Sequence, residues 1–92
     1  MELEITRYNS FFKMKGILNK RNVDLFKKEF NHVFDKLSSI TISIESIEWM
    51  DRSGVKAFAN LHEEAVSKNK KLSIIGLGCK DLYDHFKTEI AA

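Results

Sequence analysis

The chain has 92 residues and a formal net charge of +2, which suits one compact domain, residues 1–92, and argues against a nucleic-acid partner. Hydrophobic residues make up 43% and charged residues 30%, which excludes a disordered chain, and the single cysteine excludes an internal disulfide. Because no apolar run reaches the ~20 residues of a membrane helix and the N-terminus lacks a signal-peptide core, we expect a cytoplasmic protein without direct membrane insertion.

Alternating residues predict an antiparallel hairpin at the start of the chain. Leu3 and Ile5 alternate with polar residues, a turn is expected at 8–10, and the alternation resumes over 12–18. An amphipathic helix should follow, with Asn22 as its cap and an apolar stripe at steps of three and four. The stripe comprises Val23, Phe26, Phe30, Val33, Phe34 and Leu37.

The second half of the chain predicts further strands and helices in alternation. A β-branched strand over 40–45 and an irregular stretch over 46–50 precede Asp51, which can cap a helix by accepting from the backbone N–H of Ser53 or Gly54. The apolar run 72–77 is typical of a strand covered on both faces. The stripes of the second and last helices comprise Val55, Phe58, Leu61, Ala65 and Val66, and Leu82, Phe86 and Ile90.

The order of these elements, ββαβαβα, determines the expected fold class. Strands that alternate with helices imply parallel pairing through crossover connections. We therefore predict an α/β fold with a single mixed β-sheet, in which an N-terminal antiparallel hairpin is followed by parallel βαβ crossovers, flanked by helices.

Histidine and cysteine give little support to enzymatic chemistry in this chain. His32, His62 and His85 fall on three different predicted helices, and no second histidine follows His62 at the spacing of a zinc-binding helix. Cys79 lies near a predicted helix start, but no partner base is apparent. We expect the histidines to be surface or boundary residues, Cys79 to be a buried or half-buried structural thiol, and the protein not to be an enzyme.

The glycines and acidic residues give equally weak signals for a cofactor or a metal. Residues 76–78, Gly-Leu-Gly, lack the third glycine of a dinucleotide motif and instead favour a tight turn after a strand. Glu45, Glu48 and Asp51 form a loose acidic set, which a solvated loop with Asp51 as a helix cap explains without metal. We therefore expect no cofactor and no metal site.

The segment Asp51-Arg52-Ser53-Gly54 is distinguished by its predicted location. It lies beyond the carboxyl end of a parallel strand and at a helix N-terminus, where ligands and anions bind in open α/β sheets. A phosphoryl group on a serine here would lie at the positive end of the helix dipole and add about −2 charge. A plain helix cap is the alternative interpretation.

Nearly the whole chain resembles the STAS family, the sulfate-transporter and anti-sigma-factor-antagonist domain. The resemblance is carried by Gly16-Ile17-Leu18, by the strand 40–44, by the motif at 49–55 and by the strand segment 70–77. The motif Asp-Ser-Ser/Thr-Gly after an apolar strand and a short loop is fairly specific in this order of elements.

The resemblance implies a non-enzymatic, protein-binding switch. Stand-alone bacterial members bind an anti-sigma factor that is also a serine kinase, which releases the sigma factor for transcription. The kinase phosphorylates the serine directly after the aspartate, and the phosphorylated antagonist no longer binds. The partner-binding surface expected here comprises Asp51, Arg52, Ser53, Gly54 and Val55, joined by Lys56 and Asn60.

A second partner is compatible with the same resemblance. Some small STAS proteins bind the ATPase of a membrane lipid-transport complex through the same surface. The alternative function is therefore that of a transporter subunit, and the sequence leaves the oligomeric state open.

The chain departs from the family motif at the position of the switch. Arg52 stands where the family usually carries the phosphorylated serine, and Ser53 occupies the following position. Ser53 could be the acceptor instead, the antagonist could lack an off-switch, or the partner could bind without phosphorylating it. In the last interpretation Arg52 supplies a cation to the interface, where arginine pairs well with carboxylates.

Overall fold

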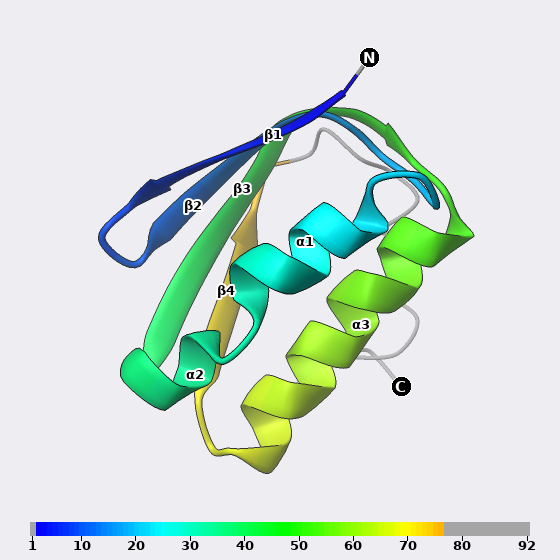
Figure 1. Ribbon diagram of the computed structural model, residues 1–92. Coiled ribbons are helices and arrows are strands. Elements are labelled where there is room, and N and C mark those ends of the chain that lie inside the picture. Colours follow the sequence, from blue (N-terminus) through cyan, green and yellow to red (C-terminus); the bar gives the residue numbers. More distant parts are fainter. Residues whose placement is uncertain (1, 77–92) are drawn as a thin grey trace.

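Four strands form one sheet in the computed structural model, which describes residues 2–76 (Figure 1). The strand order is β1-β2-β3-β4. Strands β1 (Leu3–Tyr8) and β2 (Phe11–Leu18) are antiparallel, whereas β3 (Ser39–Met50) and β4 (Lys71–Ile75) continue the sheet in parallel. The predicted mixed sheet with an N-terminal hairpin and parallel crossovers is confirmed.

The described helices are α1 (Val23–Phe30), α2 (Val33–Lys36) and α3 (Arg52–Ser67). Helices α1 and α3 lie side by side against the same face of the sheet (Figure 1). The core forms between this face and the helices, and its fully buried members include Phe12, Met14, Phe26, Phe34, Ile42 and Phe58. The predicted helix with Leu82, Phe86 and Ile90 lies outside the described residues, as do His85 and Cys79.

The expected single helix over residues 22–37 is wrong, because the chain breaks between α1 and α2. Asn31 is extended, and His32 adopts a left-handed conformation with φ of 62°. This turn redirects the chain so that Val33 and Phe34 reach the core, where both are buried. The apolar stripe was therefore predicted correctly, but two short helices bury it, and His32 lies in their connection.

Strand β3 is longer than predicted and includes residues 46–50, which were expected to be irregular. Two register shifts against β2 accommodate the extra length, one between Lys13 and Lys15 and one between Gly16 and Ile17. These shifts are bulge-like, and they let Ile47 and Met50 point into the core, where each is nearly fully buried. The strand therefore runs without interruption to the residue before Asp51.

Two predictions of burial are also wrong. Val66 is 66% exposed, because a helical residue one position after the buried Ala65 lies about 100° around the axis. No residue of β4 is buried within the described part of the chain, although the run was expected to be covered on both faces. This strand is the last in the described sheet, and β3 is its one strand neighbour there.

Gly76 follows β4 with φ of +99°, a conformation that glycine adopts without strain, and the rest of the predicted turn, residues 77–78, lies outside the described residues. A Cβ at this position would lie 2.8 Å from the backbone nitrogen of Glu45. No helix among residues 2–76 is long and apolar enough to cross a membrane.

Candidate functional site

Asp51 joins the end of β3 to the start of α3 and has the predicted role of helix cap. Its backbone is extended, and its Oδ1 accepts a hydrogen bond from the backbone N–H of Gly54 at 3.0 Å. The backbone N–H of Asp51 donates to the carbonyl oxygen of Leu18 at 3.1 Å, which fixes the cap to the end of β2. The buried Met50 anchors the strand directly before it.

The other carboxylate oxygen of Asp51 binds a distant segment. Oδ2 accepts a hydrogen bond from the backbone N–H of Lys20 at 2.9 Å. Lys20 belongs to the loop between β2 and α1, residues 19–22, which we call the β2–α1 loop. One carboxylate thus holds this loop against the amino end of α3.

The β2–α1 loop was not predicted as part of the site, and Asn22 was predicted to cap α1. Asn22 makes no side-chain cap to α1. Its Oδ1 accepts from the backbone N–H of Asn19 at 2.9 Å, and its Nδ2 donates to the carbonyl oxygen of Ile17 at 2.8 Å. The Asn19 side chain accepts in return from the backbone N–H of Arg21 at 2.9 Å. Two asparagines in a short polar segment after a strand are the sequence feature that could have indicated an ordered loop here.

Gly54 is the point of closest packing in the site. It is buried, and a Cβ there would lie 2.8 Å from Cγ and 3.1 Å from the carbonyl oxygen of Leu18. Leu18 is itself fully buried and cannot move aside without disturbing the core. A glycine at this position therefore allows α3 to begin directly against β2.

The predicted residues of the partner-binding surface lie together on α3, from Asp51 at its cap to Asn60 near its middle. Arg52, Lys56 and Asn60 are exposed, whereas Ser53 and Val55 are half-buried. The spacing of four residues places Arg52, Lys56 and Asn60 on one side of the helix, one turn apart. The Ser53 hydroxyl makes no hydrogen bond with any residue of the described part of the chain.

A shallow groove of about 230 Å³ lies between α1 and α3 beside this surface. Its floor is apolar and includes Phe26, Phe30 and Leu61, and Asn60 and Lys27 contribute to its lining. Asn60 therefore borders both the partner-binding surface on α3 and the groove that α3 forms with α1.

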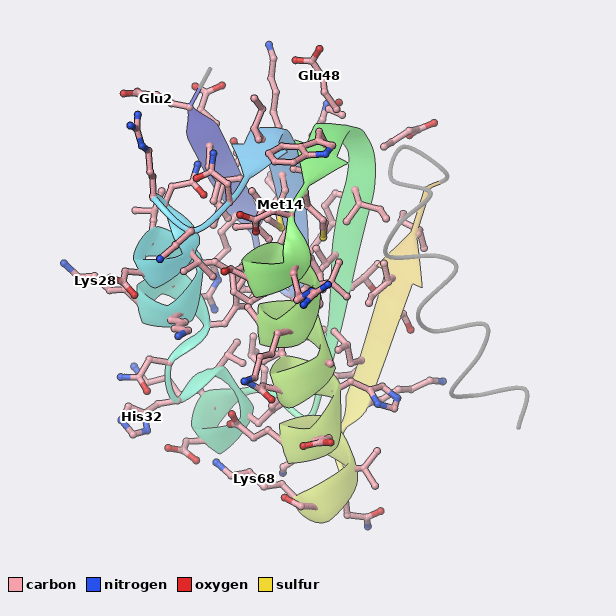
Figure 2. The ribbon with its side chains drawn as sticks, turned by 90° about the vertical axis from the view of Figure 1, so that its right-hand side faces the viewer. Glu2, Met14, Lys28, His32, Glu48 and Lys68 are labelled. Carbon is pink, nitrogen blue, oxygen red and sulfur yellow. The ribbon has the colours of Figure 1, made fainter. Side chains whose placement is uncertain are left out.

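The other candidate residues do not assemble into a chemical site. Glu45 and Glu48 are exposed on β3, and Figure 2 shows Glu48 directed away from α3. His32 lies near the opposite end of the molecule from Glu48, as Figure 2 also shows. Among residues 2–76, no group of three or more His, Cys, Asp or Glu side chains could hold a metal ion.

A charged cluster at the far end of α3 joins that end to α2. Lys68 Nζ donates to Asp35 Oδ1 and to Glu64 Oε2, each at 3.2 Å. The hydrogen bond from Lys68 lowers the pKa of Asp35, and the carboxylates of Glu64 and Asp35 raise the pKa of Lys68. These groups lie at the other end of α3 from Asp51, and they are structural.

The model of the STAS domain matches residues 1–87 of this sequence. The chain belongs to the STAS domain family. The match includes the whole described sheet, its helices and the Asp51–Gly54 corner, so the predicted family is confirmed. No curated protein matches the sequence.

Solved structures show the same fold at low identity. The STAS chain is similar to the anti-sigma factor antagonist SpoIIAA in its unphosphorylated form, with a TM-score of 0.64 and 15% identity over 79% of this chain and 71% of SpoIIAA. It is also similar to the crystal structure of Mglu, with a TM-score of 0.64 and 6% identity over 80% of this chain. The chain spans about a fifth of the length of Mglu, 19%.

Proposed function

We propose that this STAS domain is a regulatory protein-binding module of the anti-sigma factor antagonist type. Its partner is an anti-sigma factor with serine kinase activity, and it acts in the cytoplasm on transcription without being an enzyme itself. The observation that carries the proposal is the Asp51-Arg52-Ser53-Gly54 corner, held at an exposed helix start in a chain of the STAS family.

The geometry of the corner supports a role in recognition. Asp51 fixes both the helix start and the β2–α1 loop through backbone hydrogen bonds, so the surface is formed before any partner arrives. A preformed surface loses less conformational entropy on binding, which favours affinity. The partner-binding surface comprises Asp51, Arg52, Ser53, Gly54, Val55, Lys56 and Asn60.

Ser53 is the proposed phosphorylation site of this module. It is half-exposed at the second position of α3, where the helix dipole favours negative charge. A phosphoryl group would add about −2 charge at the centre of the surface, where a bound partner would have to desolvate it. Phosphorylation would thus end binding while the fold is retained.

Affinity capture from the native cell with a bulky variant tests the location of the surface. Asn60→Trp adds bulk without charge to the exposed side of α3, and Thr6→Trp adds the same bulk to an exposed position of β1. We expect the wild-type chain and Thr6→Trp to capture the same anti-sigma factor kinase, and Asn60→Trp to lose it. Equal capture by all three, or capture of a transport ATPase in place of a kinase, would contradict the proposal.

Mass spectrometry after incubation with the captured kinase and ATP tests the phosphorylation site. We expect one phosphate on the wild-type chain and none on Ser53→Ala. Undiminished phosphate uptake by Ser53→Ala would show that another residue is the acceptor.

A further inference from the structure

The exposed cations at the amino end of α3 are Lys20, Arg21, Arg52 and Lys56, which we call the cationic face. The bond from the Lys20 backbone to Asp51 places the β2–α1 loop beside Arg52. Lys56 follows Arg52 by one helical turn on the same side of α3. Residues from two separate segments therefore contribute like charges to one surface.

The carboxylate of Asp51 forms no ion pair with the side chains of these cations. Both of its oxygens accept hydrogen bonds from backbone N–H groups, those of Gly54 and Lys20. No ion pair of the described chain involves a member of the cationic face, because those ion pairs join His32, Asp35, Glu64 and Lys68. The four cations remain available to a partner.

This arrangement of charge opposes helix stability. The first turn of α3 contains no acidic residue, although the positive end of the helix dipole favours one, and Arg52 occupies it instead. Arg52 and Lys56 also repel each other at a spacing of four residues. An unfavourable local arrangement of this kind is expected where a surface serves binding.

The nearby carboxylates do not cancel the positive charge. Glu2 and Glu48 lie at the upper edge of the molecule in Figure 2, and Glu48 is directed away from α3. Glu2, which lines a pocket together with Arg21, and Asp24, in the first turn of α1, are two exposed acids against four exposed cations. The cationic face thus keeps an excess of positive charge in a chain whose formal net charge is +2.

We propose that the cationic face docks an acidic patch of Asp and Glu side chains on a folded partner protein. The inference rests on the proposed function and specifies the chemistry of its partner. Two arginines on the face suit bidentate pairing with carboxylates. The near-neutral chain as a whole, and the half-buried Val55 within the surface, fit a protein partner better than a nucleic acid or a membrane.

Titration of the isotopically labelled full chain with a peptide of about twelve glutamates, followed by NMR at about 0.05 M NaCl, tests the charge of the face. We expect chemical-shift changes concentrated at residues 20–21 and 52–56. The variant Arg52→Glu/Lys56→Glu should lose at least about tenfold in affinity for the peptide, because the two substitutions replace attraction by repulsion. The substitution at position 52 places an acid in the first turn of α3, where the helix dipole favours it, and position 56 is exposed, so this variant should fold.

The control variant Lys13→Glu/Lys15→Glu makes the same change of charge at two exposed positions of β2. We expect it to bind the peptide within about twofold of the wild-type chain. Equal weakening by both variants, or shift changes spread evenly over the lysines of α1 and β2, would overturn the inference. Tighter binding of a short DNA duplex or of phosphatidylserine vesicles at the same residues would also overturn it.

The result of the peptide titration can be distinguished from the result of the experiment that tests the proposed function. The Asn60→Trp capture experiment changes bulk and not charge, so it reports on the location of the surface alone. Loss of capture by Asn60→Trp together with unchanged peptide binding by Arg52→Glu/Lys56→Glu would retain the proposed function and reject the acidic partner.

Discussion

Gly54 belongs to the family motif and is also required for the packing of α3 against β2. A methyl group there would meet Cγ of the fully buried Leu18 at 2.8 Å. We expect Gly54→Ala to lower the free energy of unfolding by about 1–3 kcal/mol, the usual cost of overpacking a core. Urea denaturation measures this change.

Asn60→Ala is the matched control for Gly54→Ala, because Asn60 is exposed on the same helix. It should change the free energy of unfolding by less than about 0.5 kcal/mol. A Gly54→Ala protein as stable as Asn60→Ala would show that the glycine is not required for packing against β2.

The two carboxylate oxygens of Asp51 accept separate hydrogen bonds, so one substitution can distinguish the helix cap from the contact with the β2–α1 loop. Asn in its place has one acceptor oxygen, and Asn caps helices about as well as Asp. We expect Asp51→Asn to keep protection of the Gly54 amide and to lose protection of the Lys20 amide, as measured by hydrogen exchange. Unchanged protection of Lys20 would contradict the role of Asp51 in holding the β2–α1 loop.

At the scale of elements, the contact between α2 and the end of α3 depends on pH. The hydrogen bond from Lys68 lowers the pKa of Asp35, so this carboxylate stabilises the fold above its unfolded pKa, and the contribution is lost as pH falls through the lowered value. Glu64 and Asp35 raise the pKa of Lys68, so its contribution is lost as pH rises through that raised value. Both contributions are small because the groups are exposed.

Lys68→Gln tests this contact directly. Without the cation, the pKa of the Asp35 carboxyl should rise toward its ordinary value, and an NMR titration of the side-chain carboxyl measures it. Lys36→Gln removes a neighbouring cation that makes no hydrogen bond or ion pair with Asp35, and it should leave the pKa of Asp35 almost unchanged. The opposite ranking of the two variants would contradict the assignment.

The elements also show where sequence patterns suffice and where they do not. Apolar residues spaced three and four apart in the sequence identified the buried side chains Phe26, Phe30 and Phe34, because helix geometry determines which residues share a face. The break at His32 was not predicted, because α1 and α2 continue the same apolar spacing and the left-handed turn has no glycine to mark it. Propensity is a weak guide where tertiary packing decides the chain direction.

At the scale of the whole molecule, the parallel pairing in the sheet followed from the alternation of strands and helices, whereas the strand order β1-β2-β3-β4 was not predicted. The cap by Asp51 was also predictable, since its acceptor and donor are three residues apart. The contribution of Lys20 to the site was not, because its hydrogen bond to Asp51 spans 31 residues and involves a backbone atom, which has no sequence signature. Only the assembled fold brings those segments together.

A single cooperative domain over residues 1–92 is a prediction about the whole molecule. Trp49 is the one tryptophan of the chain, half-exposed on β3 two residues before Asp51. Its fluorescence therefore reports on the site, and far-UV circular dichroism reports on all helices and strands. The two probes should give the same urea midpoint, as expected of two-state unfolding. An earlier fluorescence midpoint would show that the site unfolds separately.

Site-specific photocrosslinking in the native cell tests most directly whether the amino end of α3 is the partner-binding surface. A photoreactive residue at Lys56 marks this surface, and one at Lys13, exposed on β2, marks a position outside it. We predict a covalent adduct with one partner protein from position 56 and none from position 13. An adduct from position 13 alone, or the same adduct from both positions, would contradict the account.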